Sequence, residues 1–90
     1  MRKRFNIRVN GKVQGVFFRA STKEKADSGN ISGFVRNEAD GAVYIEAEGE
    51  EENLRNFVQW CHRGPKQAHV ERCEVKEGAL VGFGRFVIEH

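Results

Sequence analysis

The sequence predicts one α+β domain in which strands and helices follow the order β-α-β-β-α-β, with a short extra strand near the end of the chain. Three observations support this prediction. Several short segments alternate apolar and polar side chains, which is typical of strands with one buried face. One longer segment repeats its apolar residues with the period of a helix. A length of 90 residues suits a single domain, which we expect to span residues 1–90.

The first strand and the first helix are predicted on either side of a glycine-flanked turn. Residues 4–13 alternate between apolar and polar side chains, which predicts a strand. A helix over residues 19–29 follows, and Gly29-Asn30 ends it because both residues tolerate the left-handed backbone conformation. The predicted apolar face of this helix is thin and consists of Ala20, Thr22 and Ala26.

Two further strands are predicted to form a hairpin over residues 31–37 and 42–48. Asp40-Gly41 between them is a good turn signal, because both residues suit the positive φ angles of tight hairpins. In the second of these strands, Glu46 and Glu48 alternate with apolar residues. We therefore expect both carboxylates to point away from the core, into solvent.

The second helix is the clearest element. Gly64-Pro65 closes it, and its apolar residues recur at the i, i+3, i+4 and i+7 positions of one helix face. Residues 68–76 predict a further strand, and the change of apolar parity between Val70 and Cys73 indicates a bulge or a late entry of the strand into the core. The apolar residues of the helix face are Leu54, Phe57, Val58 and Cys61.

Residues 83–88 predict the extra strand, with Phe83 and Phe86 in the core. The complete order of elements is that of the ferredoxin-like fold, an antiparallel sheet with two helices on one face. This fold serves many unrelated functions, so the function has to be inferred from particular residues.

Composition argues against several classes of function. The 15 basic and 13 acidic residues are interspersed and give a net charge of only +2, which provides no basic surface for nucleic acid. No apolar run is long enough to span a membrane, and no apolar region follows the basic start as in a signal peptide. We expect Cys61 and Cys73 to be reduced thiols in a cytoplasmic, monomeric protein without nucleic-acid or membrane partners.

Most catalytic arrangements are missing from the sequence. The three histidines, His62, His69 and His90, show no metal-ligand spacing with the cysteines, and we interpret them as surface residues. Asp40 could be proposed as a general base, but its place in a turn is a sufficient explanation for it.

The turn from Gln14 to Arg19 is the best candidate for a functional site. Backbone N–H groups in such a turn and at a helix N-terminus bind anions, and an arginine can bind two phosphate oxygens at once. Asn37 ends a strand, and its amide can orient a water molecule. From the residues alone, Arg19 could equally form a cap or an ion pair, and Asn37 could merely end its strand.

Two ordered motifs in the chain resemble those of the acylphosphatases, small hydrolases of carboxyl–phosphate anhydrides. The resemblance covers essentially the whole sequence and is densest over residues 7–49. The first motif consists of Val9, Gly11, Val13-Gln14-Gly15-Val16, Phe18 and Arg19. The second motif consists of Gly33-Phe34-Val35-Arg36-Asn37, Gly41, Val43 and Gly49.

The resemblance implies an enzyme that hydrolyses a small acyl phosphate to a carboxylate and inorganic phosphate, with no metal, cofactor or phospho-enzyme. It implies that Arg19 and loop amides hold the phosphate, and that Asn37 positions the attacking water. Phe17 fills the free position of the first motif, where it contacts the acyl group or belongs to the core. The amides implied by motif position are those of Gly15, Val16, Phe17, Phe18 and Arg19.

Two other functions stay open at this point. Residues 82–87 resemble a disrupted RNA-stacking motif of RNA-recognition domains, but Arg85 breaks its spacing and the charge is nearly neutral. Acylphosphatase-like domains also occur in larger proteins that process carbamoyl phosphate, and a domain without activity could still bind such a ligand. Because the sequence shows no further domain, we expect a hydrolase that acts by itself.

Overall fold

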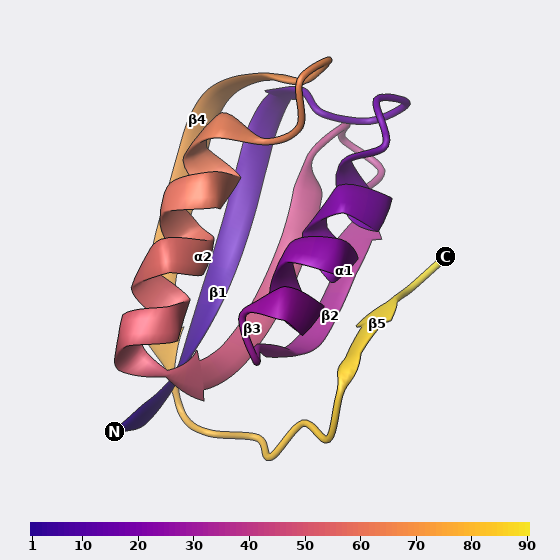
Figure 1. Cartoon of the computed structure of the whole chain (residues 1–90). Coiled ribbons are helices and arrows are strands. Elements are labelled where there is room, and N and C mark those ends of the chain that lie inside the picture. The colour runs from indigo at the N-terminus through magenta and orange to yellow at the C-terminus, as the bar shows by residue number, and fades with distance from the viewer.

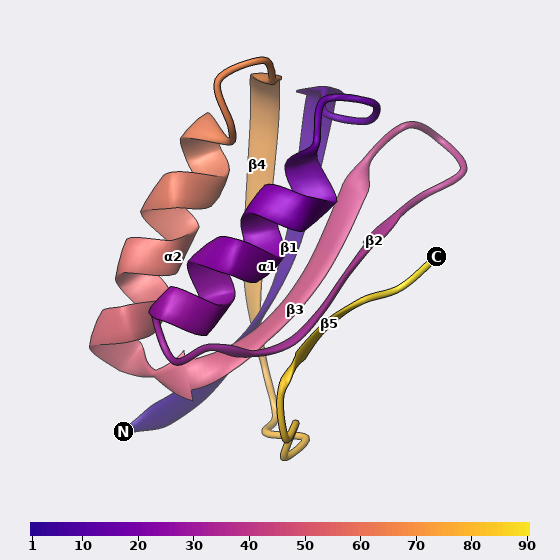
Figure 2. The same ribbon diagram turned by 45° about the vertical axis from the view of Figure 1, so that its right-hand side comes forward.

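The computed structural model describes residues 1–90 and has two layers, a five-stranded sheet and two helices that cover one of its faces (Figures 1 and 2). The strand order is β4-β1-β3-β2-β5, which confirms the ferredoxin-like prediction. The first four strands pair antiparallel, whereas β5 pairs parallel with β2. Neither helix combines the length and the hydropathy that crossing a membrane requires. The elements are β1 (Arg2–Lys12), α1 (Phe18–Ser28), β2 (Ser32–Asn37), β3 (Val43–Glu50), α2 (Glu51–Arg63), β4 (His69–Gly78) and β5 (Phe86–Ile88).

The core lies between the helices and the two central strands of the sheet. Ile7 and Val9 of β1 lie opposite Ile45 and Val43 of β3, and all four side chains are completely buried. The predicted face of α2 packs against them through Leu54, Phe57 and Cys61. These apolar contacts hold the end of β1 in place, and the candidate functional turn begins there.

Helix α1 buries a different set of residues from the one that the sequence predicts. Its buried residues are Phe18, Thr22 and Ala26, which are spaced by four and share one face, whereas Ala20 lies on another face and is exposed. The ring of Phe18 packs against that of Trp60 in α2, with ring centres 5.6 Å apart. The start of α1 is therefore anchored in the core immediately before Arg19.

Of the two alternatives for β4, a bulge or a late entry into the core, the structure shows the bulge. The register between β1 and β4 shifts between Asn10, which pairs with Arg72, and Gly11, which pairs with Val70. Glu71 is the extra residue, and this accounts for the change of apolar parity along β4.

Both cysteines are free thiols in the structure. Burial raises the pKa of Cys73 to about 11 and raises that of Cys61, inside the core, well above its usual value. Both thiols are therefore protonated at neutral pH, a state in which thiols react poorly.

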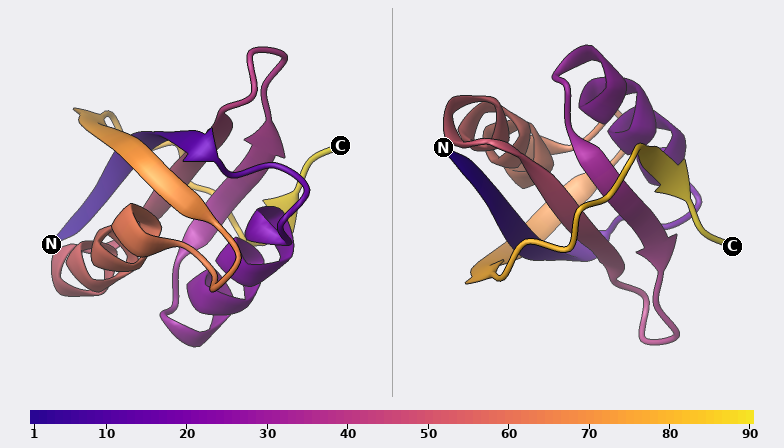
Figure 3. Two further views of the ribbon diagram at one scale, coloured as in Figure 1. Left: turned by 90° about the horizontal axis from the view of Figure 1, so that it is seen from above. Right: turned by 90° about the horizontal axis from the view of Figure 1, so that it is seen from below.

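The last strand is shorter than the sequence predicts. Only Phe86–Ile88 pair with β2, and the preceding residues form a connection that crosses from the β4 edge of the sheet to the β5 edge (Figure 3). Phe83 lies in this connection, half-buried, with its ring 5.9 Å from that of Phe34. The prediction that Phe83 is a core residue is therefore wrong, whereas Phe86 is buried as expected.

The side chain of Glu48 is buried, whereas the sequence predicts a solvated one. Its exposed fraction is 1%, and its carboxylate accepts hydrogen bonds from three successive backbone N–H groups. The donors are Val81, Gly82 at 3.0 and 3.1 Å, and Phe83 at 3.0 Å. Because these N–H groups bind the carboxylate, they do not take part in strand pairing.

The same contacts set the ionisation of Glu48. Burial raises the pKa of this carboxyl group, but the three backbone hydrogen bonds and the charge of Arg2 together lower it by more, so that it lies below its ordinary value of 4.5. The ionised carboxylate therefore stabilises the folded protein above about pH 4.5. This contribution is lost as the pH falls through the lowered pKa that Glu48 has in the folded state.

We predict that Glu48→Gln lowers the free energy of unfolding at pH 7 by about 2 kcal/mol, because a neutral amide replaces a carboxylate that accepts several hydrogen bonds. The difference from the wild type should shrink as the pH is lowered from 5 to about 2, where the native carboxyl group becomes protonated. Urea denaturation of both proteins across this range measures the difference. A difference that stays constant with pH would contradict the assigned role of the charge.

Candidate active site

The turn after β1 forms a loop with open backbone N–H groups. Gly15 and Phe17 have positive φ angles of 74° and 64°. A Cβ atom on Gly15 would meet nothing within 4 Å, so there is room for a side chain here. Glycine is favoured at this position because of its positive φ angle. No turn or cap hydrogen bond has its donor among residues 15–20, and the first such bond runs from the N–H of Ser21 to the carbonyl of Phe17. The N–H groups of the loop and of the first helical turn are thus open to a ligand.

Gln14 links this loop to the turn of the β2–β3 hairpin. Its side-chain amide donates to the carbonyl groups of Glu38 and Ala42, at 2.8 and 2.9 Å. Glu38 comes directly after Asn37, so the two hydrogen bonds bring the end of β2 to the loop although β3 separates β1 from β2 in the sheet. Strand pairing places Asn37 at this end of the sheet, since Asn37 and Val9 both lie opposite Val43, and the hydrogen bonds of Gln14 join the hairpin turn to the loop there.

Asp40 has the role of a turn former in the structure. Its carboxylate accepts a hydrogen bond from the N–H of Ala42 at 3.0 Å and forms an ion pair with Arg8. The N–H of Ala42 and the Arg8 guanidinium hold the pKa of Asp40 below its usual range. Asp40 does not line the pocket described next, so the turn explains it better than general-base catalysis does.

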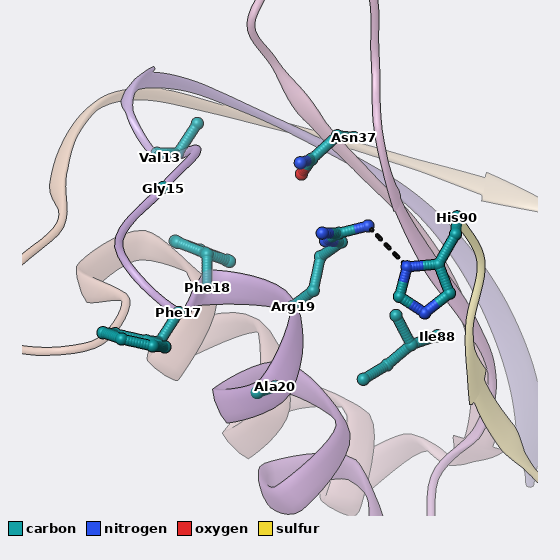
Figure 4. A pocket seen from close by; sticks show the side chains of 9 residues that line it. All are labelled: Val13, Gly15, Phe17, Phe18, Arg19, Ala20, Asn37, Ile88 and His90. Atoms are coloured by element: carbon teal, nitrogen blue, oxygen red, sulfur yellow. Dashed lines mark hydrogen bonds between the residues drawn. The ribbon is translucent and has the colours of Figure 1, made fainter.

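A pocket of about 310 Å³ lies between the loop, the first turn of α1, the end of β2 and the end of the chain (Figure 4). The guanidinium of Arg19 and the amide of Asn37 face the same space in it. The structure thus brings together the two side chains that the motifs single out. The residues that line the pocket are Val13, Gly15, Phe17, Phe18, Arg19, Ala20, Asn37, Ile88 and His90.

Arg19 is available to an anion. None of the ion pairs in the structure involves it. Its Nη1 atom alone makes contacts, with the carbonyl oxygen of Glu89 at 3.3 Å and with Nδ1 of His90 at 3.4 Å. The alternative that Arg19 serves only in an ion pair within the fold therefore does not hold.

Phe17 is not a core residue, because 74% of it is exposed at the rim of the pocket. Of the two alternatives that the sequence leaves for this side chain, the core is excluded. An aromatic residue with positive φ is unusual, and such conformations are concentrated at functional sites.

His90 and Ile88 also line the pocket, and no pattern in the sequence indicates this. His90 is exposed, as predicted for a surface residue, but its ring lies beside Arg19 (Figure 4). No spacing in the sequence connects residues 88–90 with residues 15–19, since only the pairing of β5 with β2 places them together.

The structure holds no cluster of three or more His, Cys, Asp or Glu side chains arranged to bind a metal ion.

The RNA-binding alternative finds no support in the positions of its two aromatic side chains. Phe86 is buried in the core, and Phe83 packs against Phe34. Recognition of single-stranded RNA requires exposed rings that can stack on bases.

The fold and the pocket define a small α+β domain with a candidate anion site, and comparisons with known proteins give its family. The family model described as Acylphosphatase matches residues 5–88. An acylphosphatase of Rubrobacter xylanophilus is 48% identical over 83 residues, which cover 92% of this chain and 76% of that relative. The crystal structure of acylphosphatase from Bacillus subtilis has a TM-score of 0.95 and 38% identity, with 100% of both chains covered. The chain belongs to the acylphosphatase family.

Membership in this family makes the chain an enzyme that hydrolyses acyl phosphates, as the two motifs indicate. A larger protein contains a similar unit. The crystal structure of full-length HypF in its phosphate- and nucleotide-bound form has a TM-score of 0.90 at 27% identity. This match covers 100% of the present chain and 12% of HypF.

We predict that Gln14→Ala lowers the free energy of unfolding by about 1–2 kcal/mol, since two hydrogen bonds to backbone carbonyl groups are lost. It should also reduce kcat/KM for benzoyl phosphate, because the loop and the end of β2 are no longer joined. Urea denaturation and initial-rate kinetics measure the two effects. Gln59→Ala, at an exposed position of α2, is the matched control, and equal effects of the two substitutions would rule out the link.

Proposed function

We propose that Arg19 and the backbone amides of residues 15–19 bind the phosphoryl group of the substrate, and that Asn37 positions the attacking water. The observation that supports this proposal is the single pocket shared by open N–H groups, a guanidinium without an ion pair and a side-chain amide. The amides are those of Gly15, Val16, Phe17, Phe18 and Arg19.

The reaction needs few protein groups. The oxygen of the water forms a bond to phosphorus, and the bond from phosphorus to the acyl oxygen breaks, which releases a carboxylate. This leaving group is stable as an anion, so little general-acid help is required. In a loose transition state the charge spreads over the equatorial phosphate oxygens, and the amides and Arg19 stabilise it there.

The proton of the water goes to the substrate in this proposal. No Asp or Glu side chain lines the pocket, and Nδ1 of His90 faces Arg19 (Figure 4). A non-bridging oxygen of the substrate phosphate is then the nearest basic group. The amide of Asn37 accepts from the water and donates to it, which orients the lone pair of the water toward phosphorus.

The acyl group leaves the phosphate toward the rim of the pocket. Phe17, exposed at this rim, is the candidate contact for the acyl group. We therefore expect small acyl phosphates with varied acyl parts to be accepted, because the groups proposed to act in catalysis contact only the phosphate and the water.

We predict that Arg19→Ala weakens inhibition by inorganic phosphate and lowers kcat by about 10²–10³-fold, the range expected for a lost donor to developing charge. Arg19→Lys should restore little of this, since an ammonium group cannot bind two oxygens in one plane. Hydrolysis of benzoyl phosphate measures both variants, with Arg63→Ala at the exposed end of α2 as the control. Full activity of Arg19→Lys would contradict the proposal that the Arg19 guanidinium binds two phosphate oxygens at once.

We predict that Asn37→Ala lowers kcat by about 10²-fold or more and leaves the inhibition constant for phosphate within about twofold of the wild type, because Asn37 contacts the water and not the phosphate. Activity of the wild type should persist in a chelator such as EDTA. Asn6→Ala, on β1 outside the pocket, is the matched control. A variant at position 37 that raised only KM would contradict the role of Asn37.

A further inference from the structure

The contacts of Arg19 leave part of its guanidinium group open. Both contacts use Nη1, which points to the carbonyl oxygen of Glu89 and to the ring of His90 (Figure 4). Nη2 and Nε have no hydrogen-bond partner in the protein. Two parallel N–H groups, the arrangement that matches two phosphate oxygens, are thus free while the third nitrogen is held.

The residues that hold Nη1 belong to one segment, residues 86–90, which we call the β5 segment. It lies along β2, which also carries Asn37 at its end. The backbone of Gly33 donates to the carbonyl of Arg85, and the N–H of Glu89 donates to the carbonyl of Val35, both at 2.9 Å. With only three residues in β5, this pairing is a short attachment.

The β5 segment has a second attachment through Glu48. The carboxylate of Glu48 binds the N–H groups of residues 81–83, just before the segment begins. Burying a carboxylate is costly unless hydrogen bonds compensate, and here each one comes from the connection that leads to β5. Arg2 is the nearest cation, at 3.9 Å, and is half-exposed.

We propose that Glu48 is a positioning residue for the active site: it anchors residues 81–83, and the β5 segment that follows orients the Arg19 guanidinium through the carbonyl of Glu89 and the ring of His90. The proposal rests on the proposed role of Arg19 in phosphate binding. Glu48 lies on β3 outside the pocket, and the hydrogen bonds to its carboxylate all come from the connection that precedes the β5 segment, so this segment is the path proposed for its effect on phosphate.

The test is the affinity for inorganic phosphate, measured from the shifts of the loop amides in ¹H–¹⁵N NMR spectra, which also show that each variant is folded. We expect His90→Ala to weaken phosphate binding about threefold, the factor that a weak hydrogen bond contributes. Glu48→Gln should weaken it about fivefold, because the β5 segment keeps its pairing with β2 and its buried Phe86 but loses the attachment at residues 81–83, so that both contacts of Nη1 become looser. The double variant should be no weaker than Glu48→Gln alone, since both changes act on the same path.

Two controls separate positioning from stability. Glu46→Gln removes a carboxylate on the same face of β3, where it binds Arg4 and Tyr44, and should cost stability without changing phosphate affinity. His90→Asn keeps an oxygen acceptor near the position of Nδ1 and should restore the affinity that His90→Ala loses.

Two results would overturn the proposal: a folded Glu48→Gln protein with unchanged phosphate affinity, or an additive loss in the double variant. Measuring Arg19→Ala as well shows whether the positioning role of Glu48 is wrong or whether the phosphate-binding role of Arg19 is wrong. If Arg19→Ala weakens phosphate binding and Glu48→Gln does not, only the positioning role is wrong. If Arg19→Ala leaves phosphate affinity unchanged, the role of Arg19 itself is wrong.

Discussion

The structure depends on where backbone N–H groups outside the helices and strands find their acceptors. Two groups of consecutive N–H donors do not take part in helix or strand pairing: residues 81–83 in the connection before β5, and residues 15–20 in the loop and first turn of α1. The donors of residues 81–83 converge on the carboxylate of Glu48, which belongs to the fold. The donors of residues 15–20 have no such acceptor. Successive backbone amides thus bind an anion of the protein itself at one end of the molecule. At the other end, the amides of residues 15–20 are free to bind the anion of a ligand.

Periodicity along the chain was sufficient to predict most of the fold. Leu54, Phe57 and Cys61 are buried as their helical spacing requires, and the parity change in β4 corresponds to a bulge. The errors concern residues whose environment is made by distant parts of the chain. Glu48 alternates with apolar residues and so resembles a solvated side chain, because its acceptor role depends on N–H groups 33 to 35 residues away.

The residues of the candidate site likewise fall into those that the sequence predicts and those that only the structure shows. Arg19 and Asn37 belong to two sequence motifs and could be named before their positions were known. Their presence in one pocket depends on tertiary contacts, of which the two hydrogen bonds of Gln14 to the hairpin turn are the most direct. His90 gave no signal in the sequence, since a histidine near the end of a chain is ordinarily a surface residue and only strand pairing brings it to Arg19.

Strand β2 carries two parts of the site at once. Asn37 forms its end, and Val35, two residues earlier, binds the backbone of Glu89, whose carbonyl contacts Arg19. A displacement of β2 would therefore move the amide of Asn37 together with the strand that binds Glu89, the acceptor of the Arg19 guanidinium. One strand thus couples the proposed water site to one contact of the proposed phosphate site.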